Sequence, residues 1–321
     1  MTEYNPRKVA LKSFFLGPQA ENSPWVKDLE RLIFDGWFGW RKGDHPEDGC
    51  AITEEEQKTP EFRKKTEEIK LHLEDLINRF QNEVPSFSPR YIGHMVSEIS
   101  IPALLGYITT ILYNPNNISE EVSRVGMKIE REAICDLMIM LGVNPEKARG
   151  HFTSGGTVAN IEGLVRARAR LARWIAAGLV AGRGEYKTLS EAAHQGWERY
   201  DSVVAEKGEE AIRKMHFLHS NPYGVAKEIE KRFGISYMGP VVLAPETKHY
   251  SWPKGILLLG LGADAFWPIS LDKYGKLSIP DLKRQTDKAL KENRPIVMAG
   301  GVDSQASPMP SPSVSVWVGL G

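Results

Sequence analysis

The sequence has few cysteines, no long apolar run and no excess of charge of either sign. Its two cysteines, Cys50 and Cys135, lie far apart and form no CxxC pattern. This spacing argues against a disulfide scaffold or a structural zinc site, and it suits a reducing cytosol. Lys plus Arg and Asp plus Glu each total 41, so the net charge provides no long-range attraction to nucleic acid or to an anionic membrane. We therefore expect a small neutral or zwitterionic ligand and no metal.

No stretch approaches the roughly 18 consecutive apolar residues of a membrane-spanning helix. Residues 1–12 are polar and mixed, whereas an export signal has a basic segment followed by an apolar one. The sequence therefore predicts a cytoplasmic protein without a membrane partner. Its 321 residues, of which 41% are hydrophobic, suffice for a packed core in one large domain or two ordinary ones.

The first part of the chain is rich in aromatic side chains and contains few strand signals. Residues 60–84 form an amphipathic helical pattern, in which apolar side chains recur on one side. These positions are Phe62, Ile69, Leu73, Leu76, Ile77 and Phe80. Such a helix must cover apolar surface, either in its own core or on a partner subunit. A second helix is predicted over residues 119–141, because Glu120 and Glu121 would lie in its first turn, where the helix dipole favours anions.

From Phe152 onward the pattern changes to glycine-rich turns, long helices and short apolar runs. Long helices are predicted at residues 158–179 and 189–206. The segments PVVLAP at 240–245 and PIVMA at 295–299 are candidates for short buried strands. The amphipathic segment between them, residues 279–292, is predicted to be a helix that Pro280 and Asp281 open. Strands that alternate with helices predict a parallel α/β sheet with crossover helices.

The segment FTSGGTVAN, residues 152–160, joins a turn of small and hydroxyl-bearing residues to the start of a long predicted helix. The first amides of a helix have no internal partners, the dipole favours negative charge there, and glycines let a phosphate approach the backbone. The pattern predicts a phosphate held by neutral donors, since the motifs GxGxxG and GxxxxGK[ST] are absent. An ordinary glycine turn with Thr157 as the helix cap is the alternative.

The segment APETKHYS, residues 244–251, follows a predicted strand. It therefore lies at the carboxyl end of that strand, where open α/β sheets bind ligands. An imidazole at this place, that of His249, can stack on a flat cofactor ring or transfer protons. A loop histidine that is merely hydrogen-bonded is the alternative.

Several segments in a fixed order resemble one enzyme family. They are SFFLGPQAEN, GWRKG, RYIGHMVSEISIPALLGY, LYNPNNIS, TSGGTVAN and ETKHYSWPKG. Together they resemble the group II pyridoxal-phosphate-dependent amino-acid decarboxylases, and most of all the bacterial tyrosine and acidic amino-acid decarboxylase branch. The resemblance runs from about Ser13 to Met298. It implies an α/β, aspartate-aminotransferase-like (fold type I) domain that binds pyridoxal 5'-phosphate, preceded by a helical N-terminal segment.

The resemblance also implies functions for individual residues. The cofactor residues are Gly155, Gly156, Thr157 and His249, and the substrate-pocket residues are His94, Asn117 and Ser119. Gly156 and Thr157 match the family's phosphate contacts, and Gly155 allows the close approach. His249 matches the histidine that stacks on the pyridine ring and helps to protonate the substrate carbon. Residues 124–126 depart from the small residues common near that pocket, so the particular amino-acid substrate is not carried over.

The resemblance stops near residue 299. The family continues with a cofactor loop, an aspartate on the pyridine nitrogen and a His-Lys pair whose lysine forms the Schiff base, whereas residues 300–321 are dense in Ser and Pro. We therefore expect three parts: a helical dimerisation segment at 1–89, a partial cofactor-binding large domain at 90–299, and an aberrant tail at 300–321.

This pattern predicts a C-terminally truncated or frameshifted decarboxylase that is inactive as this chain, although full-length members of the family form homodimers and act on amino acids. Lys254, which follows His249 closely, is not expected to carry the cofactor. One alternative is a non-catalytic dimerisation remnant of a decarboxylase gene. Another is a different fold type I carbon–carbon lyase.

Overall fold

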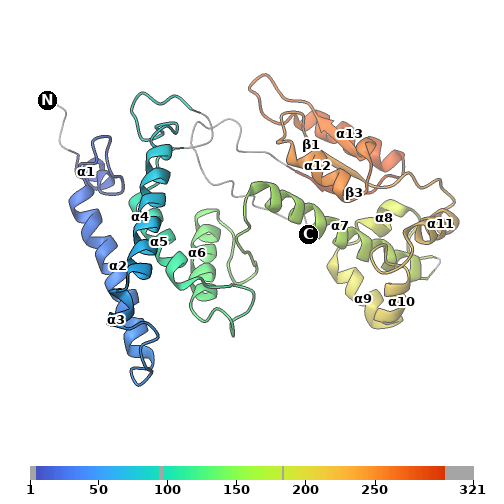
Figure 1. Ribbon diagram of the computed structural model, residues 1–321. Helices are drawn as coiled ribbons and strands as arrows, with labels where there is room; N and C mark the ends of the chain where they lie inside the picture. The colour runs from blue at the N-terminus through green and yellow to red at the C-terminus, as the bar shows by residue number, and fades with distance from the viewer. Residues whose placement is uncertain (1–4, 94–96, 183, 301–321) are drawn as a thin grey trace. The chain divides into compact units, whose positions relative to one another are not determined.

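The structure, a computed structural model, describes residues 5–93, 97–182 and 184–300 and divides into two units, residues 1–151 and 152–321 (Figure 1). The division between the units falls after His151, whereas the sequence analysis placed a functional boundary after residue 89. The three predicted parts of the chain stay a prediction. All of the predicted tail except Gly300 lies outside the described residues.

Helices make up the regular structure of the described part of the first unit. They are α1 (Pro6–Lys12), α2 (Ser23–Asp44), α3 (Glu54–Gln57), α4 (Pro60–Phe80), α5 (Ile101–Tyr113) and α6 (Gly126–Met140). Its packing is sparse, since Val26 and Ile101 are the buried hydrophobic side chains among the residues described in this unit. The amide of Ile101 donates to the carbonyl of Phe14 at 2.7 Å, which ties the start of α5 to the segment after α1.

Helix α4 confirms the predicted amphipathic helix and ends at Phe80, a few residues earlier than expected. Pro60 occupies its first turn, and the Thr59 hydroxyl accepts the amide of Phe62 at 3.3 Å, which caps the helix. The apolar row of α4 is exposed to solvent: Ile69 is 67% exposed and Phe80 is 64% exposed. The row therefore does not serve the core of its own unit.

The helix predicted over residues 119–141 is wrong in its first part, because α6 begins only at Gly126. The preceding residues form turns that polar side chains hold. The Ser123 hydroxyl donates to Asn117 Oδ1 at 2.7 Å, and Arg131 pairs with Glu120. Short polar side chains compete in this way with helical backbone bonds.

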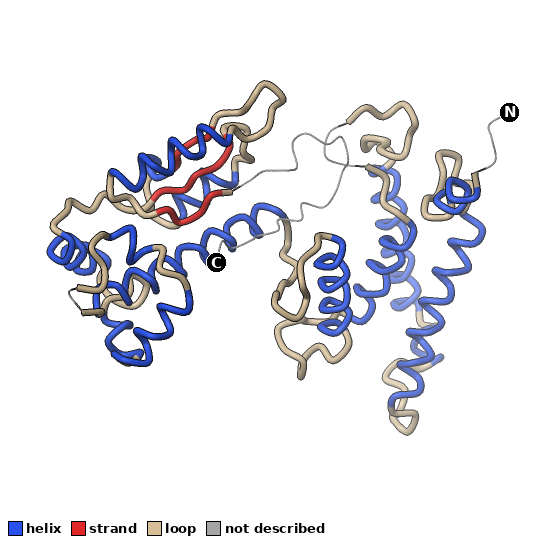
Figure 2. Tube along the Cα trace, turned by 180° about the vertical axis from the view of Figure 1, so that it is seen from behind, coloured by secondary structure: helices blue, strands red, loops and turns tan. Residues whose placement is uncertain are grey.

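The second unit is an α/β domain, whose strands are shown in red in Figure 2. Its helices are α7 (Gly156–Val180), α8 (Leu189–Ala193), α9 (Trp197–Lys207), α10 (Glu209–Lys214), α11 (Pro222–Phe233), α12 (Ser251–Leu258), the 3-10 helix η1 (Ala263–Ala265) and α13 (Ile279–Lys291). Its strands are β1 (Val241–Pro245), β2 (Phe266–Ile269) and β3 (Ile296–Ala299), which form a parallel sheet in the order β2-β1-β3. The predicted α/β class and both predicted strands are confirmed.

Helices cover both faces of this sheet. On one face α7 and α12 pack against Val242 and Val297, and on the other face α13 packs against Val241 and Leu243. This arrangement explains the apolar run of β1, every residue of which is buried. The C-terminal half of α7 also carries a second cluster, with α8, α9 and α10.

Strand β3 lies at one edge of the sheet and contains an irregularity opposite Val241 and Val242. Two side chains from the helical layer form hydrogen bonds with the backbone of β3. Arg170 Nη2 donates to the carbonyl of Val297 at 3.1 Å, and the amide of Ile296 donates to Nε2 of His194 at 3.3 Å. Side chains of α7 and of the end of α8 therefore satisfy backbone groups of this strand.

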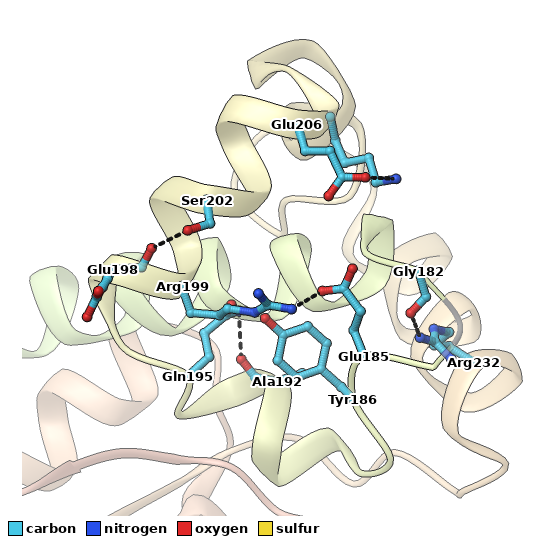
Figure 3. Close-up of polar contacts among 11 residues, drawn as sticks. Gly182, Glu185, Tyr186, Ala192, Gln195, Glu198, Arg199, Ser202, Glu206 and Arg232 are labelled. Carbon is cyan, nitrogen blue, oxygen red and sulfur yellow. Dashed lines mark hydrogen bonds and ion pairs between the residues drawn. The ribbon is translucent and has the colours of Figure 1, made fainter.

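The second long helix predicted for this unit is instead two helices, α8 and α9. Gly196 separates them with a φ of 83°, a conformation that glycine adopts without strain. Figure 3 shows the polar contacts of this region: the Gln195 side chain donates to the carbonyl of Ala192 at 3.0 Å, and Arg199 pairs with Glu185. The break is therefore held by specific contacts on both sides.

Candidate cofactor site

The N-terminus of α7 contains the predicted phosphate turn. The helix begins at Gly156, close to its predicted start, and Gly155 is its N-cap. The alternative in which Thr157 caps the helix is wrong, because Thr157 lies inside the first turn. The first helical bond is donated by the amide of Ala159 to the carbonyl of Gly155 at 3.1 Å. No side chain within the described residues caps this end, so the amides of the first turn of α7 have no capping acceptor.

The turn before α7 is open and free of negative charge. Ser154 and Gly155 are exposed, and a Cβ atom added at Gly155 would meet no atom within 4 Å. The Thr153 hydroxyl donates to the carbonyl of Gly155 at 3.0 Å, which fixes the turn. The first turn of α7 carries no acidic residue. Open space, uncapped amides and the positive end of the helix dipole are the features that a phosphate group requires.

His249 lies in the short connection between β1 and α12, as predicted from its position after a strand. Hydrogen bonds connect it to α7 through Ser251: two join His249 to Ser251, and a third joins Ser251 to Asn160 of α7. The Ser251 hydroxyl lies 2.9 Å from Nδ1 of His249, the Ser251 amide donates to the same Nδ1 at 3.2 Å, and Asn160 Nδ2 donates to the Ser251 hydroxyl at 2.8 Å. Asn160 lies in the second turn of α7. The structure thus links His249 to the beginning of α7 across about ninety residues of sequence.

Close packing of α12 on α7 sets this arrangement. Ser251 is fully buried, and Trp252 is buried beside it. Gly255 permits the approach of the two helices, because a Cβ atom there would lie 2.7 Å from Cδ1 of Leu164. The side chain of His249 is only partly buried, and its ring centroid lies 4.1 Å from that of Tyr250. One face of the imidazole is therefore already paired with an aromatic ring.

The two lysines near His249, Lys248 and Lys254, contact aromatic rings or a backbone carbonyl. Lys254 is exposed, and its Nζ lies 5.8 Å from the centroid of the Tyr250 ring. Lys248 Nζ donates to the carbonyl of Glu246 at 3.3 Å and lies 4.7 Å from the centroid of Phe266. A lysine that forms a Schiff base is typically a desolvated amine. That Lys254 does not carry the cofactor stays a prediction.

The predicted substrate-pocket residues belong to the first unit. His94 lies outside the described residues. Asn117 donates from Nδ2 to Glu130 at 2.9 Å, and the carbonyl of Ser119 accepts the amide of Ser123 at 2.9 Å. These bonds fix the turn before α6. A substrate-binding function for the three residues stays a prediction.

Sequence reasoning missed Asn160 and Ser251, although both lie within segments that were singled out. The available signal was the His-x-Ser spacing at the start of a helix, where a side chain can accept a free amide. Among the described residues, no three His, Cys, Asp or Glu side chains are grouped so that they could hold a metal ion. None of the described helices is long and apolar enough to cross a membrane.

Comparison with known proteins finds several L-tyrosine decarboxylases as sequence relatives. The chain is 31% identical over 304 residues to the L-tyrosine decarboxylase of Levilactobacillus brevis, covering 91% of this chain and 45% of that protein. It is 28% identical to the L-tyrosine decarboxylase of Enterococcus faecalis, covering 91% of this chain and 46% of that protein. A crystal structure of mouse CSAD in apo form matches with a TM-score of 0.48 and 20% identity, over 84% of this chain and 48% of that chain. No family model matches.

The sequence matches agree with the resemblance that the motifs indicate. The resemblance to group II pyridoxal-phosphate-dependent amino-acid decarboxylases is confirmed, since these relatives are amino-acid decarboxylases. Within this class it is similar to the bacterial L-tyrosine decarboxylases, and it spans less than half the length of these relatives.

Proposed function

We propose that the second unit of this chain contributes the phosphate- and ring-binding part of a pyridoxal-phosphate site for amino-acid decarboxylation. The observation that carries the proposal is the uncapped, open N-terminus of α7, which a chain of hydrogen bonds connects to His249. The phosphate is a dianion near neutral pH, and the first amides of α7 offer it neutral donors at a positive helix end. The relatives named above are decarboxylases, which supports this assignment.

Each residue has a defined task in the proposed site. The amides of Gly156 and Thr157, together with the Thr157 hydroxyl, hold the phosphate, and Gly155 leaves room for it. His249 lies against the flat face of the pyridine ring and presents Nε2 as a proton donor. When bound, pyridoxal phosphate supplies an electron sink for the charge that develops as the substrate carboxylate departs. The expected substrates are amino acids, and the expected reaction releases carbon dioxide.

The proposal includes a homodimer that forms through the first unit. Helices α2 and α4 expose large apolar side chains, among them Trp40 at 53% and Leu73 at 55%. Apolar surface of this extent on a monomer marks an interface. A second copy of the chain fits because closed two-fold dimers are the commonest assemblies of identical chains.

Titration of the purified chain with pyridoxal phosphate, followed by absorbance and by quenching of tryptophan fluorescence, tests cofactor binding. Thr157→Ala removes one donor to a charged group, so the dissociation constant should rise about tenfold. Thr66→Ala, at an exposed position on α4, is the matched control and should leave the dissociation constant unchanged. Equal affinity of wild type and Thr157→Ala would contradict the phosphate assignment.

A further inference from the structure

The hydrogen bonds around His249 determine which ring nitrogen carries its proton. The backbone amide of Ser251 donates to Nδ1 at 3.2 Å. An amide N–H can only donate, so Nδ1 must present its lone pair. The neutral imidazole then has its proton on Nε2. Because Ser251 is the first residue of α12, the same bond also satisfies one of the free amides at the start of that helix.

The Ser251 hydroxyl reinforces this choice. It lies 2.8 Å from Nδ2 of Asn160 and 2.9 Å from Nδ1 of His249. The amide nitrogen of Asn160 has hydrogens and no free lone pair, so the hydroxyl oxygen accepts from Asn160. The hydroxyl hydrogen is then available for Nδ1. Donation runs in one direction along the chain, from Asn160 to Ser251 to His249.

Burial strengthens the preference for this direction of hydrogen-bond donation. Ser251 is fully buried, and Asn160 is partly buried on the packed side of α7. A buried hydroxyl whose hydrogen bonds are removed or reversed loses stability that water does not restore. If Nδ1 instead carried the proton, its N–H would meet the Ser251 amide N–H, and the Ser251 hydroxyl would have to turn its own hydrogen away from the ring. The network therefore favours the Nε2–H form of the neutral ring over the Nδ1–H form.

We propose that Asn160 and Ser251 are positioning residues that hold His249 as its Nε2–H tautomer. The inference rests on the proposed function, since it gives the ring proton a direction at the cofactor site. Neither residue needs to touch the cofactor. Their effect passes through the imidazole, whose Nδ1 is engaged inside the protein while Nε2–H is the proton available to a ligand.

The test uses nitrogen NMR of the full chain labelled with ¹⁵N-histidine, recorded at a pH at which the ring is neutral. The two tautomers give distinct patterns of ring-nitrogen shifts and couplings to the ring carbon-bound protons. The chain has 8 histidines, so His249→Gln identifies the His249 signals by their loss. The wild-type ring should show Nε2–H.

Asn160→Asp reverses the chain with almost no change in shape. The new carboxylate can only accept, so it takes the Ser251 hydroxyl hydrogen, and the hydroxyl oxygen then accepts from Nδ1. The Nδ1–H fraction of the ring should rise, because only the Ser251 amide then still favours Nε2–H. Asn221→Asp is the matched control: it makes the same replacement at the N-cap of α11, where the side-chain oxygen accepts the amides of Tyr223 and Gly224. This control should retain the Nε2–H signals.

A double variant separates relay through the hydroxyl from a general effect of the added charge. Asn160→Asp combined with Ser251→Ala lacks the hydroxyl but keeps the Ser251 backbone position, so its amide should restore Nε2–H. A wild-type ring that is mainly Nδ1–H, or an Asn160→Asp ring with the same tautomer populations as the wild type, would overturn the inference. An Nδ1–H ring in the double variant would also overturn it. Pyridoxal phosphate affinity, measured on the same samples, separately decides the proposed function.

Discussion

His216 shows how burial of one residue sets a pH dependence. Its side chain is almost fully buried, its Nδ1 accepts the amide of Leu218 at 3.1 Å, and its ring lies 4.7 Å from that of His219. Burial, with smaller contributions from the charges of His219 and Arg173, lowers the pKa of His216 from 6.5 to about 4. The folded state therefore favours the neutral form of the His216 ring.

The sign of the stability change follows from this lowered pKa. Above pH 6.5 the ring is neutral in both states, and as the pH falls toward 4 only the unfolded chain takes up the proton. His216 should therefore cost the second unit about 3 kcal/mol of stability between pH 6.5 and 4. Urea unfolding at a series of pH values measures it. His216→Gln should flatten this part of the profile, whereas His72→Gln, at an exposed position on α4, should leave it unchanged.

Some residues of the candidate site could be predicted from the sequence, and others could not. The glycine turn and His249 could be found because each has a local signature, a cluster of small residues before a helix and a histidine after a strand. Asn160 and Ser251 could not be assigned, because their bond joins residues 91 positions apart and exists only once α12 packs on α7. The sequence shows which side chains are available, and tertiary packing decides their partners.

Elements with strong local patterns were predicted well. Helix α7, strands β1 and β3, and helix α13 agree with the sequence within a few residues. Strand β2 was missed because its four residues, FWPI, include Pro268, which is unusual in a strand. Pro268 is tolerated because β2 is an edge strand of the sheet. The break between α8 and α9 was missed because a single glycine is a weak signal within an otherwise helical segment.

The contact of α7 with α8 depends on a missing side chain at Gly178. A Cβ atom there would lie 2.4 Å from Cβ of Ala192 and 3.3 Å from its Cα. Neither atom can rotate away, so α8 itself must move. Gly178→Ala should lower the free energy of unfolding of the second unit by about 1–3 kcal/mol, since overpacking outweighs the gain in helix propensity.

Chemical denaturation followed by circular dichroism measures the effect of Gly178→Ala. Gly39→Ala is the control, because Gly39 lies within α2 with no atom within 4 Å of an added Cβ. It should be neutral or stabilise its unit by about 0.5–1 kcal/mol. Equal effects of the two substitutions would show that the contact between α7 and α8 is not close-packed in solution.

At the scale of the whole molecule, the open apolar rows of α2 and α4 predict self-association. The wild-type chain should sediment as a dimer at micromolar concentration. Replacing Leu73 and Leu76 of α4, each at least half exposed, by Glu places charges in the proposed interface and should shift the protein toward the monomer. Lys64→Glu on the same helix changes the charge away from the row and serves as the control. A wild-type chain that sediments as a monomer at all concentrations would refute the dimer.

The second molecular prediction concerns turnover. The lysines beside His249 are either exposed or engaged with aromatic rings and carbonyl groups, so neither offers the desolvated amine that a Schiff base requires. We expect that this chain binds pyridoxal phosphate without releasing carbon dioxide from amino acids. Borohydride reduction with peptide mapping should give scattered labelling of lysines. Stoichiometric labelling of one lysine, accompanied by carbon dioxide release that Lys254→Arg abolishes, would show the opposite.

The two side chains bound to β3 have a consequence for solubility. A short parallel sheet with an open edge is a template on which the strand of another molecule can add, and ordered aggregates grow by such additions. At β3 the amide of Ile296 is already occupied by His194 and the carbonyl of Val297 by Arg170. An incoming strand would have to displace an imidazole and a guanidinium before it could form a ladder. These two side chains therefore protect the sheet edge against fibrillar association as well as fastening the helical layer to the sheet.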